Sequence, residues 1–209
     1  MLDILTKGGW IMLPLALCSI VAVAISIERF LIFKSVKTSK RIADNVIVLI
    51  NKGQNKEAIT IFESEKSPLL RVLATGIANR HHCAKGMEGA AIAEIAFMKR
   101  GLPILDTIIT LSPLLGLLGT IIGMISSFQV MSVAGMGQPH AVTGGIAEAL
   151  IATATGIIVA VVTLIPYNYF LARIEGETAA MEYYGTRLEM ALDTLSNRSE
   201  KHEDTKRLA

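Results

Sequence analysis

The chain has 209 residues, of which 52% are hydrophobic, and its formal net charge is only +2. Its mean hydropathy of +0.51 is too high for an ordinary water-soluble domain and is typical of a membrane protein with a sizeable polar part. Two cysteines without paired spacing argue against a disulfide framework or a zinc site, and no nucleotide loop or nucleophile triad is present. We therefore expect a membrane protein that is not an enzyme, with no cofactor, no metal and no nucleic-acid partner.

Three apolar segments are each long enough to cross a hydrocarbon core of about 30 Å as a helix. They run from Gly8 to Ile27, from about Leu102 to Val130 and from about Gly144 to Leu171. The sequence thus predicts an all-α integral membrane protein with three transmembrane helices, of which the second and third extend into a helical cytoplasmic region. The predicted order is a short periplasmic amino terminus with the first span (1–33), a cytoplasmic helical region (34–100), the second span (101–130), a periplasmic loop (131–143), the third span (144–172) and a cytoplasmic helix and tail (173–209).

The distribution of Lys and Arg sets the predicted orientation. Residues 34–100 carry twelve of them and residues 173–209 carry six, whereas residues 1–9 carry one and residues 129–147 carry none. Basic segments that flank spans stay in the cytoplasm, so the amino terminus and the loop are expected outside. A cleaved signal peptide is the alternative, because Ala22-Val23-Ala24 has the form of a cleavage site. Against it, the apolar run continues past these residues, and cleavage would export the most basic segment.

The basic regions carry helical patterns of their own. Apolar residues from Ile42 to Ile50 recur at helical spacing, and a short helix is expected over about 55–63. Ser67-Pro68 has the form of a helix start. No strong stop signal lies between Gly86 and Gly101, so the second span is expected to extend into the cytoplasm. The third span is expected to continue as a helix to about residue 195, before a polar end.

Glu148 is the residue of this chain that most needs a functional explanation. It is the only Asp, Glu, Lys or Arg between Asp106 and Arg173, and it begins an apolar run long enough to span a bilayer. A carboxylate in a transmembrane helix costs roughly 2.5–3.5 kcal/mol at the bilayer centre, and less near an interface. A chain that retains such a group usually uses it, so Glu148 is predicted to be a proton or ion site.

Further polar side chains lie along the second and third spans. One helical face of the second span is predicted to carry the residues that follow one another at spacings of four and three: Asp106, Thr110, Pro113, Leu117, Thr120, Met124 and Ser127. On the third span, Thr155 shares the face of Glu148, whereas Thr153 lies about 140° away from it and is expected to face a neighbouring helix or the edge of a lumen. These faces are predicted to line a shared cavity, because polar residues in membranes face a bundle interior or water.

Small residues and isolated hydroxyls leave simpler interpretations open. Gly119 and Gly123 form a GxxxG pattern, and Gly156 lies in a second four-residue repeat, both of which permit close helix packing. A threonine in a membrane helix commonly bonds its own backbone carbonyl and need have no further role. Asp106 lies within reach of cytoplasmic water, so a structural role for it is as reasonable as a functional one.

Two segments resemble a known family. The run Pro-Leu-Leu-Gly-Leu-Leu-Gly-Thr at 113–120 is similar to the second-span signature of the ExbB/TolQ/MotA proton-channel family. The run Ala-Glu-Ala-Leu-Ile-Ala-Thr-Ala-Thr-Gly at 147–156 resembles its third-span signature. The amino-terminal Gly-Gly-Trp-Ile-Met-Leu-Pro-Leu and the Ile-Glu-Arg-Phe at 27–30 fit the branch of ExbB-like biopolymer transport proteins. The resemblance covers nearly the whole chain.

The resemblance implies both an assembly and a proton pathway. Members of this family form pentamers around a single-span partner of the ExbD/TolR type, and a TonB-like energy transducer is a further candidate partner. The family's intramembrane glutamate matches Glu148, and its threonines match Thr120 and Thr153. Thr155 and Asp106 are added to the predicted pathway from their positions on the spans, since no family-wide acid matches Asp106.

The expected function is therefore a proton-channel subunit of an inner-membrane motor that couples proton flow to work at the outer membrane. A TolQ-like role in maintaining the envelope and a non-conducting membrane scaffold are the alternatives. A solute transporter is a poorer match, because three spans without an internal repeat offer no substrate pocket of the usual kind.

Overall fold

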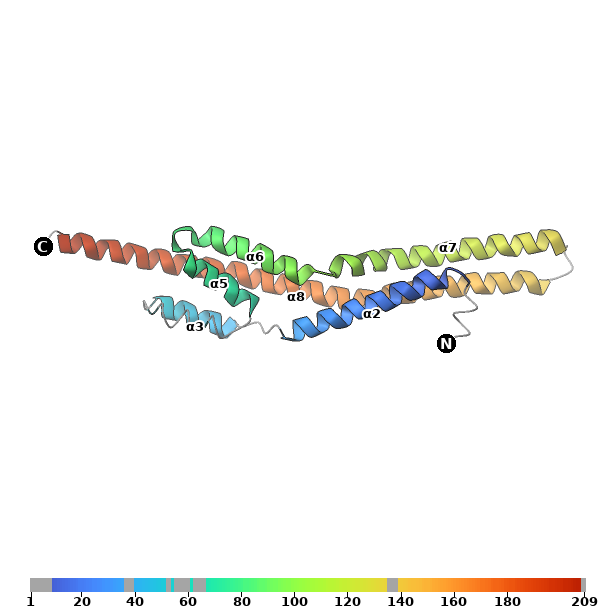
Figure 1. The fold of residues 1–209 in the computed structure, drawn as a ribbon, viewed down its shortest axis with the longest axis horizontal. Coiled ribbons are helices and arrows are strands. Elements are labelled where there is room, and N and C mark those ends of the chain that lie inside the picture. The colour runs from blue at the N-terminus through green and yellow to red at the C-terminus, as the bar shows by residue number, and fades with distance from the viewer. Residues whose placement is uncertain are drawn as a thin grey trace. The chain divides into compact units, whose positions relative to one another are not determined.

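The computed structural model describes residues 9–35, 40–51, 54, 61, 67–134 and 139–207, and these residues form helices without any strand (Figure 1). The predicted short helix over 55–63 lies outside the described residues apart from Ile61. In chain order the helices are α2 (Met12–Ser35), α3 (Lys40–Asn51), α5 (Pro68–Ala78), the 3-10 turn η1 (Arg80–His82), α6 (Cys83–Lys99), α7 (Leu102–Ala134) and α8 (Pro139–Arg207).

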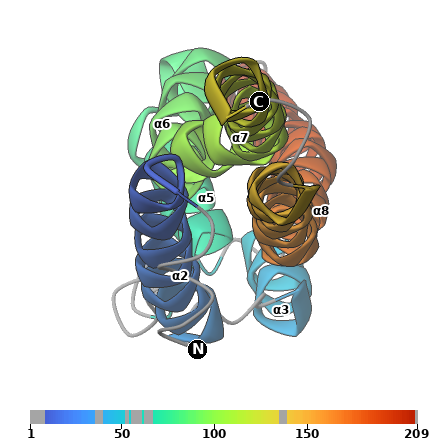
Figure 2. The ribbon, with the colours of Figure 1, turned by 90° about the vertical axis from the view of Figure 1, so that its right-hand side faces the viewer.

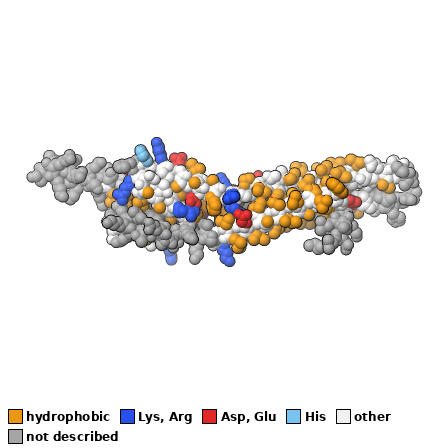
Figure 3. Space-filling view, in the orientation of Figure 1, with side chains coloured by type: hydrophobic (Ala, Val, Ile, Leu, Met, Phe, Trp, Pro, Cys, Tyr) orange, Lys and Arg blue, Asp and Glu red, His pale blue; other side chains and the backbone are white. Residues whose placement is uncertain are grey.

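The chain divides into two compact units. The first comprises residues 1–31 and 101–170, and we call it the apolar unit. The second comprises residues 32–100 and 171–209, and we call it the charged unit. Hydrophobic side chains cover the visible face of the apolar unit in Figure 3. Three helices of the chain are long and apolar enough to cross a membrane, as the sequence predicts, and these apolar stretches lie within Met12–Lys34, Leu102–Ser132 and Thr143–Leu195.

In the apolar unit, α2, α7 and the first part of α8 are three neighbouring helices (Figure 2). Small residues bring α7 and α8 together: Gly119 lies against Ala152, and Gly123 lies against Ala149. An open groove of about 200 Å³ lies between α2 and α8, and Ala22 and Val159 are among the residues that line it. The outward faces remain rich in exposed Leu, Ile and Val, as lipid-facing helices require.

In the charged unit, large apolar side chains form the core. Leu69, Leu70 and Leu73 of α5 are fully buried, and Leu188 of α8 is buried within the same unit. The helix α5 begins at Pro68 after Ser67, which has an extended backbone, as the Ser-Pro pattern predicts. Burying such side chains stabilises a fold in water by roughly 1.5–3 kcal/mol each.

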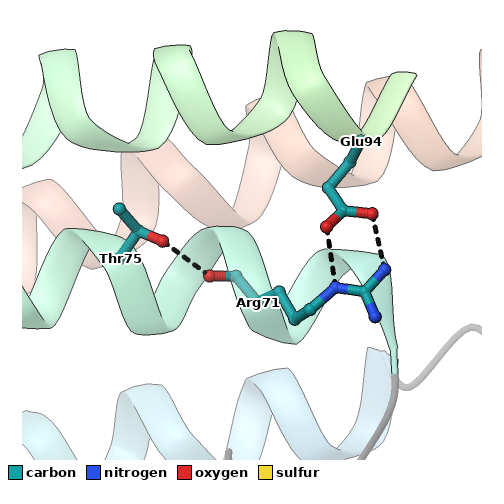
Figure 4. A network of polar contacts seen from close by, with 3 residues as sticks. All are labelled: Arg71, Thr75 and Glu94. Atoms are coloured by element: carbon teal, nitrogen blue, oxygen red, sulfur yellow. Dashed lines mark hydrogen bonds and ion pairs between the residues drawn. The ribbon is translucent and has the colours of Figure 1, made fainter. Parts of the chain in front are cut away.

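Ion pairs join the surfaces of the helices in the charged unit. The guanidinium group of Arg71 on α5 donates two hydrogen bonds, of 2.7 and 2.5 Å, to the carboxylate of Glu94 on α6 (Figure 4). Arg187 of α8 bonds Asp44 of α3 at 2.6 Å, and the Tyr184 hydroxyl donates to the other oxygen of the same carboxylate at 3.1 Å. Burial, together with this hydrogen bond, raises the pKa of Tyr184.

The expected extension of the second span into the cytoplasm is interrupted at Arg100 and Gly101. The helix α6 ends at Lys99, Arg100 adopts an extended ψ of 130°, and Gly101 has a φ of +84°, which a residue with a side chain rarely adopts. The helix α7 then begins at Leu102. At the other end of the chain, α8 continues beyond residue 195 to Arg207.

Candidate functional site

Glu148 lies in the apolar unit, in the third turn of α8, and its side chain is half-buried. It makes no hydrogen bond or ion pair with another described residue of the chain. Its carboxyl group lies directly beside Gly9, in the turn that leads into α2. A Cβ atom built on Gly9 would lie 3.3 Å from Cδ of Glu148 and would overlap Oε1. The carboxyl group is thus partly covered by backbone from the start of the chain.

The predicted threonines have different hydrogen-bond partners. Thr153 donates a hydrogen bond of 3.0 Å to the backbone carbonyl of Gly116 on α7. Its hydroxyl therefore faces the neighbouring helix, which is one of the two orientations expected from the sequence. Thr120 donates to its own helix, to the carbonyl of Leu117 at 2.6 Å. Thr155 likewise donates to Ile151 at 2.8 Å. Of the three hydroxyls, only that of Thr153 connects two helices.

Glycines allow the backbones of α7 and α8 to lie very close to each other. A Cβ on Gly116 would lie 3.0 Å from Cα of Thr153, and a Cβ on Gly123 would lie 3.0 Å from the carbonyl oxygen of Gly145. A Cβ on Gly156 would overlap the carbonyl oxygen of Ser112. These backbones can approach only because no side chain separates them. The predicted packing glycines Gly119, Gly123 and Gly156 all lie in this contact, and Gly116 is added to them.

The predicted polar face of α7 is different from the face that packs against α8. Most of its residues, including Asp106, Thr110, Leu117 and Met124, are exposed on the single chain, whereas Pro113 and Thr120 are half-buried. The exception is Ser127, which is buried and lies beside Gly145. Asp106 stands near the start of α7, and its backbone carbonyl accepts a hydrogen bond from Thr110. The single chain therefore presents this face outward and does not enclose it.

The chemistry available at this site is that of one titratable carboxyl group among hydroxyls and glycines. A carboxyl group can take up and release a proton, whereas a threonine hydroxyl does not titrate in the physiological range and can only orient a partner. No group of three or more His, Cys, Asp or Glu side chains able to hold a metal ion occurs in the described part of the chain. In the charged unit, burial raises the pKa of the Cys83 thiol, with a smaller contribution from Glu189.

Two residues of this site were missed by reasoning from the sequence. Gly9 contacts Glu148, and the side chain of Ile11 lies 3.5 Å from the position of a Cβ on Gly119. Both belong to the turn before α2, far from α8 in the sequence. A glycine pair before an apolar run signals a turn or a helix start, but nothing in its pattern names the residue it will contact.

Comparison with known proteins identifies the family to which this chain belongs. The model of the MotA/TolQ/ExbB proton channel family matches residues 63–183, which is more than half of the chain and includes α7 and the site around Glu148. The chain belongs to this family. The resemblance of the two membrane motifs to the family is thereby confirmed.

Similar proteins extend the match over nearly the whole chain. The ExbB-like 3 biopolymer transport protein of Synechocystis sp. is 31% identical over 208 residues, which cover 94% of this chain and 97% of the relative. The biopolymer transport protein ExbB of Pseudomonas putida is 28% identical over 182 residues, or 81% of this chain and 55% of the relative. The Tol-Pal system protein TolQ of Pseudomonas aeruginosa is 40% identical, but over only 92 residues, or 44% of this chain and 40% of the relative.

Proposed function

We propose that this chain is the proton-channel subunit of an ExbB–ExbD-like motor in the bacterial inner membrane, and that Glu148 carries the protons. The observation that carries the proposal is the carboxyl group of Glu148, the only Asp or Glu between Asp106 and Arg173, in an apolar run long enough to cross a membrane. Protonation removes the charge of this group and so changes which neighbouring helix can lie beside it. One charge that moves through 100 mV gains about 2.3 kcal/mol, so a few protons per step suffice to drive a mechanical change.

The proposal includes a ring of identical subunits. The polar face of α7, with Asp106, Thr110 and Thr120, is exposed or half-exposed on the single chain. Polar groups in a membrane face water or protein rather than lipid. A ring of copies, a pentamer by analogy with the family, turns this face inward around a single-span partner of the ExbD/TolR type. A TonB-like energy transducer is the third component that we expect.

The orientation also belongs to the proposal. The excess of Lys and Arg in residues 34–100 and 173–209 supports a cytoplasmic charged unit and a periplasmic amino terminus. In this orientation Glu148 lies in the periplasmic half of its span, and Thr153 and Thr155 follow it towards the cytoplasm. Asp106 is then the acid at the cytoplasmic end of the pathway.

We place an ExbB-like role before a TolQ-like role because the relative that aligns with most of this chain carries an ExbB-like name. The ExbB-like relative from Synechocystis aligns with 94% of this chain, whereas the TolQ relative aligns with 44%. A TolQ-like role is tested by deleting the gene. Loss of energised uptake with an intact envelope supports the ExbB-like role, whereas leakage of periplasmic contents supports the TolQ-like role.

The proton site is tested by Glu148→Gln in the complex with its partner. The amide keeps the size and the hydrogen-bonding capacity of the side chain but cannot release a proton, so proton flux into vesicles should fall to the level of empty vesicles. Glu148→Asp should retain partial flux, because its carboxyl group is withdrawn by one methylene. Full flux through the Gln variant in a well-assembled complex would rule out proton transfer by Glu148 and leave a non-conducting scaffold as the better reading.

Thr153→Ala and Thr120→Ala serve as matched controls for this experiment. Neither removes a titratable group, so both should conduct at levels between those of the wild type and of Glu148→Gln. Thr153→Ala should have the larger effect of the two, because it also removes the hydrogen bond to Gly116 on the other helix. If Thr153→Ala conducts no better than the Gln variant, proton flux depends on helix placement as much as on the carboxyl group.

A further inference from the structure

The turn before α2 lies against the carboxyl group of Glu148, although the two segments are far apart in the sequence. The three heavy atoms closest to a Cβ built on Gly9 are Oε1, Cδ and Cγ of Glu148, and the Cδ distance is 3.3 Å. Gly116, Gly123 and Gly156 instead approach mainly the backbone of the facing helix. Gly9 is therefore close to a functional side chain rather than to a helix surface.

Two independent features favour glycine at this position. The φ of Gly9 is +71°, a conformation that residues with side chains rarely adopt. Any side chain would in addition occupy the space of the Glu148 carboxyl group. Either the backbone of the turn or the carboxyl group would have to move if Gly9 were replaced.

Packing fixes the place of this turn between α7 and α8. A Cβ on Gly119 of α7 would lie 3.5 Å from Cγ2 of Ile11 and 2.7 Å from Cβ of Ala152 on α8. The side chain of Ile11 thus lies where the two helices meet. The turn is also tied to α2, because the carbonyl of Gly9 accepts a hydrogen bond of 3.1 Å from the backbone N–H of Met12.

We propose that Gly9 is a positioning residue for Glu148, and that the turn Gly9–Ile11 forms one wall of the proton site. The inference rests on the proposed role of Glu148 as the proton carrier. The turn begins α2, and the amino end of a helix carries a partial positive charge that favours a nearby carboxylate. Residues 107–172 contain no Lys or Arg, so this helix end places beside Glu148 a partial positive charge that this stretch of the chain does not supply.

The proposal is tested by the rate at which a hydrophobic carbodiimide modifies Glu148 in the assembled complex, followed by mass spectrometry. Gly9→Ala should push the carboxyl group out of the turn and away from the helix end, so modification should become at least about tenfold faster, which corresponds to about 1.4 kcal/mol. Gly9→Asn should show the same increase. Asparagine tolerates a positive φ better than alanine, so backbone strain alone would affect it less.

Gly101→Ala is the matched control for strain. Gly101 also has a positive φ, of +84°, but a Cβ there would meet Ile25 and Arg29 rather than Glu148. Its modification rate should equal that of the wild type. An unchanged rate in folded Gly9→Ala, or an equal increase in Gly101→Ala, would overturn the proposal.

Rescue by a shorter acid separates positioning from general damage. Glu148→Asp withdraws the carboxyl group by about one bond length, so it should leave room for a side chain on Gly9. The variant Gly9→Ala combined with Glu148→Asp should therefore be modified at the rate of Glu148→Asp alone. A further increase of the size seen in Gly9→Ala would show that Gly9 acts without contacting the carboxyl group.

A cross-link tests the wall even if the Gly9 variants do not fold. A Cβ on Gly119 would lie 3.7 Å from Cβ of Ile11, which is within the range for a disulfide. In a chain with Cys18→Ser and Cys83→Ser, the pair Ile11→Cys and Gly119→Cys, with Ala152→Gly to provide room, should form an intramolecular disulfide on mild oxidation. Failure to form it would show that the turn lies elsewhere.

The two proposals fail in different ways. Carbodiimide modification and cross-linking report where the carboxyl group and the turn lie, and neither depends on proton flow. If Glu148→Gln conducts fully while Gly9→Ala still accelerates modification, the proton-carrier role falls and the contact stands. If Glu148→Gln abolishes flux, but the Gly9 variants are modified at the wild-type rate and the disulfide does not form, only the positioning role of Gly9 is ruled out.

Discussion

The apolar unit and the charged unit are both built from helices, but different side chains hold their helices together. In the apolar unit α7 meets α8 through glycines and alanines, with one hydrogen bond from Thr153 to Gly116. In the charged unit fully buried leucines such as Leu73 form the core, and ion pairs such as Arg71–Glu94 link the surfaces.

The difference follows from the solvent that each unit is expected to meet. Lipid tails are as apolar as leucine, so burying a leucine between membrane helices gains little, and close contact between backbones becomes the main source of attraction. In water, the burial of large apolar side chains is the dominant favourable contribution. The same chain therefore uses small residues to hold together one unit and large residues to hold together the other, and substitutions should affect the two units by opposite rules.

The largest effect is expected from adding volume to the apolar unit. Gly156→Leu would force a side chain into the carbonyl of Ser112 on α7, where even a Cβ overlaps it. We expect the α7–α8 contact to be lost and the protein to leave size-exclusion chromatography in mild detergent as aggregate. The smaller change Gly156→Ala should lower the free energy of unfolding by about 1–3 kcal/mol, the usual range for overpacking.

Gly144→Ala on the same helix is the control for this substitution. No atom lies within 4 Å of a Cβ built there, so the variant should elute and melt like the wild type. If Gly156→Ala is as stable as Gly144→Ala, the close contact of α7 and α8 is not what stabilises the apolar unit.

An intermediate effect is expected from removing volume in the charged unit. Leu73→Ala deletes a fully buried side chain, which typically costs about 2–5 kcal/mol. Hydrogen exchange of peptides from α5 and α6, measured by mass spectrometry on the full chain, should accelerate accordingly. Met190→Ala is the control, because Met190 is 64% exposed and its removal should change the free energy of unfolding by no more than about 0.5 kcal/mol. Equal exchange in the two variants would contradict a leucine-based core.

The smallest effect is expected from the ion pair of α5 and α6. Arg71 keeps 49% of its side chain exposed, so solvent screens the bond to Glu94 despite its two-pronged geometry. A double-mutant cycle with Arg71→Ala and Glu94→Ala should give a coupling energy of about 0.2–1 kcal/mol. Salt at 1 M should reduce that coupling, because the screening length falls to about 3 Å. A coupling above 2 kcal/mol that resists salt would make the pair a principal support of the unit.

The three apolar helices, the helical nature of the polar regions and the prominence of Glu148 are all predictable from the sequence. Each of these depends on local patterns. A run of apolar residues and a helical period are properties of neighbouring residues, and a single acid within such a run is visible without any knowledge of the fold. The Ser67-Pro68 start of α5 is of the same kind, because a proline at the first helical position acts within one turn.

Which helix faces meet depends on contacts between residues that are far apart in the sequence, so the fold is needed to identify them. The GxxxG pattern of Gly119 and Gly123 predicts close packing of α7, but its spacing does not name α8 as the partner. The same contact includes Ser112 and Gly116, which no sequence pattern singled out. A glycine in the sequence does not indicate which segment will pack against it. Its effect is to leave out a side chain, which allows any suitably placed backbone to approach. The contact of Gly9 with Glu148 has the same origin, since it depends on a turn with a positive φ and on how α2 packs, neither of which is visible in the spacing of residues.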